Sequence, residues 1–88
     1  MYYLYILKCA DKTLYTGITT DLKRRIAEHN NSNLSARYTS SRRPVKLVYS
    51  KKFKNRSIAS KEEARIKKLM RDKKLELIKN TPKIIFNK

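Results

Sequence analysis

Apolar and polar positions at the start of the chain follow the pattern of β-strands. Residues 2–8 are rich in aromatic and branched side chains, which favour a strand, and residues 13–19 form a second such segment. Between them, Ala10-Asp11-Lys12 has the composition of a turn. These features predict an N-terminal β-hairpin.

A helix is expected directly after the hairpin. Asp21 is a good N-cap, and Leu22 and Ile26 lie four residues apart, so they share one face. The helix should end near residues 30–33, where Asn and Ser cluster and compete for backbone hydrogen bonds. Residues 34–44 are polar and basic, and they predict a loop.

The second half of the chain predicts one more strand and two helices. Val45–Phe53 carries alternating apolar residues, as expected for a third strand. Ser57 can cap a long helix that runs to about Met70. A break near Asp72 and a short helix to about Lys79 should follow.

The predicted order is therefore ββαβαα, which favours a compact α/β (α+β) fold with a three-stranded antiparallel sheet flanked by helices. The 88 residues suffice for one domain with a single modest core. We expect this domain to span residues 1–88, with its core at about 2–79. Residues 80–88 form a short tail, whose apolar part, 84–86, could dock on the core.

The charge balance points to a polyanionic partner. There are 23 Lys and Arg against 7 Asp and Glu, a formal net charge of +16. Residues 45–88 hold 15 basic and 4 acidic side chains, and residues 1–44 hold 8 and 3. Such a field attracts nucleic acid, although a solvated, Lys-rich surface is a plainer alternative. Charge alone predicts binding and not cutting.

Several classes of protein are disfavoured. The sequence contains no run of about 18 apolar residues, and its first residues show neither a basic segment nor a cleavage site. Cys9 is the single cysteine, which excludes an internal disulfide and a multi-cysteine zinc site. We expect a cytoplasmic protein without a membrane partner and assume that it is a monomer.

Two groups of side chains could carry chemistry on the hairpin and the first helix. Tyr5 and Tyr15 lie on paired strands and can project toward one place. Arg25 and His29 are four residues apart, so they share the helix face that points at the sheet. Each residue also has a plainer explanation: tyrosines usually pack, an arginine often lays its stem on the core, and a lone histidine is usually structural.

Glu63 is the third unusual residue, because it falls on an otherwise apolar stripe with Ala59, Ile66 and Met70. Such a carboxylate needs an explanation. One alternative is structural: Ser60-x-x-Glu63 has the spacing of a capping box, which requires the helix to begin at Ser60 rather than Ser57.

Taken together, these residues resemble the GIY-YIG nuclease family. Tyr3-Leu4-Tyr5 and Tyr15-Thr16-Gly17 are similar to the two halves of its signature, and the resemblance covers residues 2–79, closest to a small, single-domain bacterial branch. Arg25, His29 and Glu63 match the family's Arg, its frequent His and its metal-binding Glu. Two positions differ from the pattern: Tyr3 replaces the first glycine, and Ile18 stands where repair nucleases tend to carry a polar or basic residue.

The resemblance implies metal-dependent hydrolysis of phosphodiester bonds. Glu63 would bind one Mg²⁺ or Mn²⁺, and Arg25 would hold the phosphate. Tyr5 would be the general base and Tyr15 its positioning partner, with the pKa of Tyr5 lowered by the metal, by Arg25 and by the positive protein. His29 is an alternative base or proton relay, because its pKa is better matched.

The resemblance favours an endonuclease in repair or recombination and favours DNA over RNA as the partner, but the sequence alone leaves DNA or RNA, and endonuclease or exonuclease, open. The basic residues expected to contact nucleic acid are Arg24, Arg37, Arg42, Arg43 and Lys67. Two alternatives remain: a catalytically weak or inactive binding module on the same scaffold, and a basic accessory protein of a ribonucleoprotein.

Overall fold

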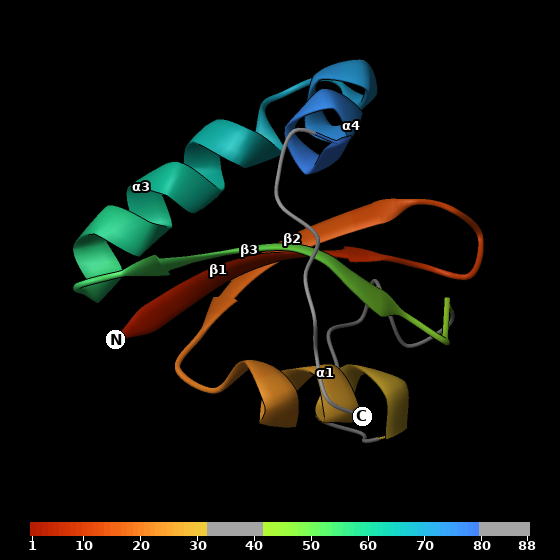
Figure 1. The fold of residues 1–88 in the computed structure, drawn as a ribbon, viewed down its shortest axis with the longest axis horizontal. Helices are drawn as coiled ribbons and strands as arrows, with labels where there is room; N and C mark the ends of the chain where they lie inside the picture. The colour runs from red at the N-terminus through yellow and green to blue at the C-terminus, as the bar shows by residue number, and fades with distance from the viewer. Residues whose placement is uncertain (32–41, 80–88) are drawn as a thin grey trace.

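A computed structural model of the protein describes residues 1–31 and 42–79. The described elements are strands β1 (Tyr2–Lys8), β2 (Leu14–Thr19) and β3 (Lys46–Phe53) and helices α1 (Leu22–Asn31), α3 (Arg56–Lys67) and α4 (Arg71–Lys79). Their order confirms the predicted ββαβαα fold (Figure 1). The expected loop at 34–44 and the apolar tail at 84–86 lie wholly or mostly outside the described residues.

The three strands form one antiparallel sheet in the order β2-β1-β3. The most apolar strand, β1, lies in the centre, and its residues Leu4, Tyr5, Ile6 and Leu7 are all buried. β2 pairs only with β1 in this sheet and is therefore an edge strand. Its pairing places Gly17 opposite Tyr5.

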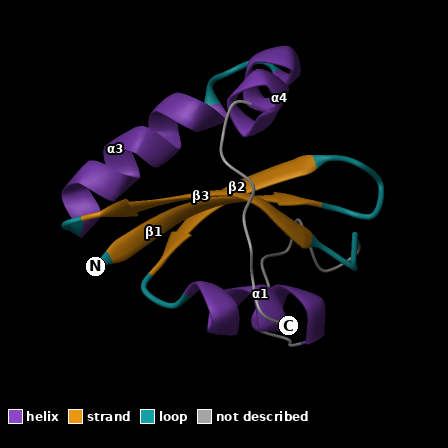
Figure 2. Ribbon diagram, in the orientation of Figure 1, coloured by secondary structure: helices purple, strands orange, loops and turns teal. Residues whose placement is uncertain are grey.

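Helices cover both faces of the sheet, with α1 on one face and α3 and α4 on the other (Figures 1 and 2). Side chains alternate between the faces, as the pleat of a strand requires. Leu4 and Ile6 pack with Ile66 of α3, whereas Tyr5 and Leu7 belong to a second cluster on the α1 face. The face of the sheet that carries Tyr5 is therefore the face that α1 covers.

The start of α1 agrees with the prediction. The Asp21 carboxylate accepts a hydrogen bond from the backbone N–H of Arg24 at 3.1 Å, which is N-cap geometry. Leu22 and Ile26 pack on the cluster that contains Tyr5. The face that carries Leu22 and Ile26 therefore contacts the sheet, as expected.

Three details of the C-terminal helices were predicted wrongly. The N-cap of α3 is Asn55, whose side chain accepts from the Ile58 N–H at 3.0 Å, so Ser57 lies inside the helix. The helix ends at Lys67, and Met70 falls in the break, where it is 76% exposed instead of buried. Asp72 lies in the first turn of α4, where a carboxylate is favourable to the helix dipole.

Candidate active site

The two tyrosines of the hairpin meet on the α1 face of the sheet. The ring centroids of Tyr5 and Tyr15 are 6.4 Å apart, which confirms that the side chains project toward one place. Gly17 makes this arrangement possible. A Cβ atom at position 17 would lie 2.6 Å from the Tyr5 hydroxyl oxygen, so only glycine lets the Tyr5 ring cross β2 toward the sheet edge.

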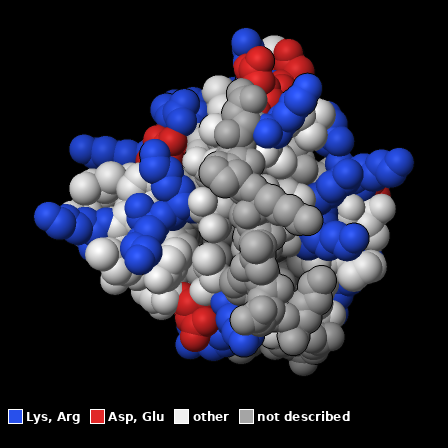
Figure 3. Space-filling view, in the orientation of Figure 1, with Lys and Arg blue, Asp and Glu red and all other residues white. Residues whose placement is uncertain are grey.

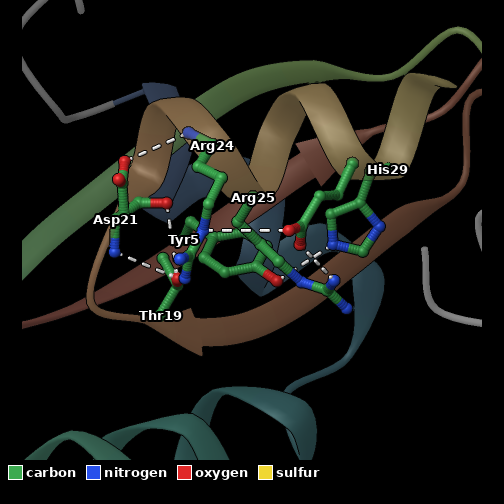
Figure 4. A network of polar contacts seen from close by, with 7 residues as sticks. Tyr5, Thr19, Asp21, Arg24, Arg25 and His29 are labelled. Atoms are coloured by element: carbon green, nitrogen blue, oxygen red, sulfur yellow. Dashed lines mark hydrogen bonds and ion pairs between the residues drawn. The ribbon is translucent and has the colours of Figure 1, made fainter. Parts of the chain in front are cut away.

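His29 closes this cluster from α1. Its Nε2 is 3.0 Å from the Tyr5 hydroxyl oxygen (Figure 4). Its ring also packs edge-on against both tyrosines. The His29 side chain is fully buried. The pKa of His29 is lowered to about 4, chiefly by burial and also by the nearby Arg25 and Arg43 cations, while Glu28 partly opposes this lowering. His29 is therefore neutral at physiological pH, and in the tautomer that carries its proton on Nδ1 its Nε2 accepts a hydrogen bond from the Tyr5 hydroxyl.

Arg25 and its neighbour Arg24 have different surroundings. The side chain of Arg25 is 24% exposed and that of Arg24 is 63% exposed, so Arg25 faces the sheet and Arg24 faces solvent, as expected. Arg25 reaches the Tyr5 hydroxyl, and this hydrogen bond lowers the pKa of Tyr5. The sheet-facing arginine is thus part of the tyrosine cluster.

Glu28 was missed by the sequence analysis. Its Oε1 accepts from Arg25 Nη1 at 2.9 Å, and its Oε2 lies 3.7 Å from Arg24 Nε. Spacings of three and four residues on a helix favour such pairs, so this rule alone could have identified Glu28. The carboxylate holds the Arg25 side chain and partly neutralises it.

The Tyr5 hydroxyl is harder to ionise than expected. Burial raises the pKa of Tyr5 to about 12, which outweighs the lowering effect of the Arg25 hydrogen bond. The negative charges of Tyr15 and Glu63 contribute to this rise. Arg25 lowers the pKa of Tyr5 as expected, but the expected net lowering is wrong, because desolvation of the buried ring dominates.

Glu63 approaches the cluster from the opposite face of the sheet. It lies on α3, which packs against β2, the edge strand that the Tyr5 ring crosses. The negative charge of Glu63 makes the smallest of the contributions that raise the pKa of Tyr5. Its Oε2 is 3.2 Å from Lys67 Nζ. Because α3 begins at Arg56, Glu63 lies well inside the helix, and the capping-box alternative is excluded.

A metal ion at this place would have one protein carboxylate. Within residues 1–31 and 42–79, no three His, Cys, Asp or Glu side chains are grouped so that they could hold a metal. A single carboxylate at the sheet edge fits Mg²⁺ or Mn²⁺, since Mg²⁺ in particular usually keeps several waters and takes substrate phosphates as ligands. The donor set does not fit a closed structural zinc site.

Of the other predicted basic residues, Arg42 and Arg43 lie shortly before β3, and Lys67 is the last residue of α3. Arg43 Nε donates to the His29 carbonyl at 2.6 Å, and Arg42 pairs with Asp11 at 2.9 Å. Asn30 fixes the start of β3 through both polar atoms of its side chain, which bond the N–H and C=O of Val45 at 2.7 and 3.2 Å. Arg37 lies outside the described residues. The contacts made by Arg43 and Asn30 hold the end of α1, and with it His29, next to the start of β3.

Comparisons with known proteins agree with this geometry. A family model described as the GIY-YIG catalytic domain matches residues 1–76. The chain is 52% identical over 80 residues to a UPF0213 protein of Syntrophus aciditrophicus, covering 91% of this chain and 92% of that one. It is 55% identical to a UPF0213 protein of Desulfotalea psychrophila, covering 93% and 74%.

Two solution NMR structures have the same fold. A UPF0213 protein from Bacillus halodurans superimposes with a TM-score of 0.58 at 42% identity, covering 90% of this chain and 84% of that one. A protein from E. faecalis gives a TM-score of 0.59 at 44% identity, covering 86% and 81%. In the part of the chain that the structure describes, no helix is long and apolar enough to cross a membrane. With the signature tyrosines assembled on β1 and β2 and the family model matching most of its length, the chain belongs to the GIY-YIG family.

Proposed function

We propose that the protein is a divalent-metal-dependent nuclease that hydrolyses phosphodiester bonds. One observation carries the proposal: the Tyr5 hydroxyl is the point where four groups from three elements converge. His29 Nε2 lies 3.0 Å from it, Arg25 bonds to it, the Tyr15 ring packs beside it, and the Glu63 charge acts on it. Structural packing alone needs neither the arginine nor the carboxylate.

Arg25 is the phosphate ligand in this proposal. A guanidinium offers several N–H donors in a plane, and the Glu28 pair engages Nη1. A phosphate oxygen can accept from these donors in exchange with their present partners, and such bonds gain strength as negative charge develops in the transition state. A phosphate that arrives here would compete with Glu28 for the same cation.

Tyr5 and His29 together accept the proton of the attacking water. As the water oxygen bonds to phosphorus, its proton passes to the Tyr5 oxygen, and the Tyr5 hydroxyl proton passes to His29 Nε2. The bond from phosphorus to the leaving oxygen breaks, and that oxygen is protonated from solvent. The relay avoids a free phenolate, which a pKa of about 12 makes costly in this buried place.

Glu63 is the residue that would hold the divalent cation. When bound, Mg²⁺ or Mn²⁺ supplies charge neutralisation at the phosphate and the leaving oxygen. Glu63 pairs with Lys67 in the described structure, so the lysine must move or share the carboxylate with the cation.

A binding module without turnover is the second candidate, and one observation favours it. The raised pKa of Tyr5 and the lowered pKa of His29 both oppose proton transfer from the hydroxyl to the imidazole in the free protein. A module of this kind would keep the basic surface and bind nucleic acid without cutting it.

The deciding experiment incubates the purified protein with Mg²⁺, Mn²⁺ or EDTA and a panel of nucleic acids. Single-stranded, duplex and branched DNA and RNA are each labelled at one end, and products are resolved by length. Metal-dependent cutting of at least one substrate is the expected result. Binding of the panel without cutting in either metal would favour the binding module.

A further inference from the structure

A hollow on the face opposite the tyrosines is lined by two cations. It has a volume of about 200 Å³ and lies between the end of the β1–β2 hairpin and the beginning of α4. Its lining residues are Thr13, Leu14, Arg71 and Lys74. None of them is acidic, so the hollow presents positive charge and hydrogen-bond donors.

One of the two cations is held by a hydrogen bond, and the other is half-buried. Arg71 Nη2 donates to the Lys12 carbonyl at 2.7 Å, which fixes the guanidinium at the turn of the hairpin. Lys74 is half-buried, unlike its neighbour Lys73, which is exposed. Among the described residues, no ion pair joins Arg71 or Lys74 to a carboxylate. Both charges are thus available to an anion that enters the hollow.

The acidic residues of α4 point elsewhere. Successive helical residues are rotated by about 100°, so Arg71 and Lys74, three apart, share a face. Measured from the midpoint between Arg71 and Lys74, Asp72 lies about 130° and Glu76 about 170° around the same helix. In the view of Figure 3, acidic atoms lie at the top, the upper left and the bottom of the molecule, and Lys and Arg atoms lie on both its left and its right side.

The position of the hollow relates it to the candidate active site. Leu14 belongs to edge strand β2, which also carries Tyr15 and Gly17. From Leu14 to Gly17 the strand rises by about 10 Å, which is roughly three nucleotide steps of a duplex strand. A nucleic-acid strand that follows the outer edge of β2 could therefore reach both places.

From these observations we infer that Arg71 and Lys74 form a phosphate-binding subsite for the nucleic-acid backbone, a few nucleotides from the bond that is cut. The subsite rests on the proposed function, since its ligand is a further phosphodiester group of the same substrate. It anchors the strand at the hairpin end of β2 and fixes the direction in which the strand crosses the tyrosines.

The test compares Arg71→Ala, Lys74→Ala and Lys73→Ala in EDTA, where no metal-dependent cutting occurs. Affinity for a labelled oligonucleotide is measured by anisotropy at several salt concentrations, after thermal melting has shown that each variant is folded. Arg71→Ala and Lys74→Ala should each weaken binding several-fold and reduce the salt slope by about 0.9. Lys73→Ala removes the same charge from the neighbouring position and should change affinity much less.

Three results would overturn the subsite. Equal effects of Lys74→Ala and Lys73→Ala would mean that only the general positive field matters. A 5′-mononucleotide that perturbs the Thr13 and Leu14 amides at the affinity of the oligonucleotide would indicate a free-nucleotide site. A Lys74→Ala protein that binds like the wild type, while the wild type still cuts, would refute the subsite and leave the nuclease proposal intact.

A separate outcome concerns the proposed function itself. If the wild type neither bound nor cut nucleic acid, the nuclease proposal and the subsite would both be refuted.

Discussion

At the scale of single residues, the site depends on which arginine of an adjacent pair faces the sheet. Arg25→Ala should reduce the cleavage rate by roughly 100- to 1000-fold, by analogy with loss of one preorganised donor to a developing charge. Arg24→Ala removes the same charge from an exposed side chain. It should leave the rate nearly unchanged and reduce the salt slope of binding by at most about 1.

Single-turnover cleavage at saturating enzyme is the measurement for this pair. Lysine at position 25 should restore only part of the rate, because it lacks the planar fork of donors. Small and equal losses in the two alanine variants would mean that no organised phosphate site exists at α1.

The burial of His29 predicts how the stability of the protein depends on pH. His29 has a pKa of about 4 in the folded protein against about 6.5 in an unfolded chain. Above pH 6.5 both states are neutral at this residue. As pH falls from 6.5 to 4, only the unfolded state gains the proton, so stability should decrease by up to about 3 kcal/mol.

Urea unfolding at several pH values checks this sign and window. His29→Gln cannot take up the proton, so its stability should fall less over the same window. Carboxylates titrate in both proteins and cancel in the comparison. Parallel pH profiles for the wild type and His29→Gln would show that His29 is not kept neutral by burial.

At the scale of elements, α3 must begin correctly for Glu63 to reach the edge of β2. Asn55→Ala removes the acceptor of the Ile58 N–H, and it should lower the free energy of unfolding by about 0.5–2 kcal/mol. Ser57→Ala is the control, because Ser57 lies inside the helix and is exposed. Chemical denaturation should show little change in the free energy of unfolding for Ser57→Ala. A larger decrease for Ser57→Ala than for Asn55→Ala would show that Ser57 is the N-cap, as the sequence analysis predicted.

The elements were largely predictable, and their ends were not. Strand composition and the Asp21 cap gave the hairpin, α1 and the ββαβαα order correctly, because these signals are local. The start of α3 was misplaced because the sequence analysis took Ser57 as the cap and did not consider Asn55, which is an equally good cap residue. The exposure of Met70 was missed separately, because the helix ends at Lys67, three residues before it.

The members of the tyrosine cluster were predictable, whereas its partner Glu28 and the energetics of the site were not. The spacing of Tyr5, Tyr15, Arg25 and His29 placed them together, and the structure does so. The direction of the Tyr5 pKa shift was missed, because it depends on how deeply the ring is buried beneath α1 and over Gly17. Burial of that kind is a property of packing between elements and has no local signal in the sequence.

At the scale of the whole molecule, the net charge of +16 should govern affinity. We expect binding to duplex or single-stranded nucleic acid to weaken at least tenfold between 50 and 200 mM salt, as release of counterions from about two phosphates requires. Anisotropy titrations across this range measure the effect. An affinity independent of salt, or no binding at 50 mM, would contradict a nucleic-acid ligand.

Binding depends on the net charge of the whole molecule, whereas cutting depends on one carboxylate. The substitution Glu63→Gln therefore distinguishes binding from cutting. The change keeps size and helix preference but removes the proposed ligand of the cation. Glu62→Gln is the matched control, because Glu62 is adjacent on α3 and pairs with Arg65. The most direct measurement is the Mg²⁺-dependent cleavage rate of the wild type and both variants, with affinity measured in parallel. Glu63→Gln should abolish cutting and keep or improve binding, and Glu62→Gln should do neither; undiminished cutting by Glu63→Gln would contradict the proposed nuclease site.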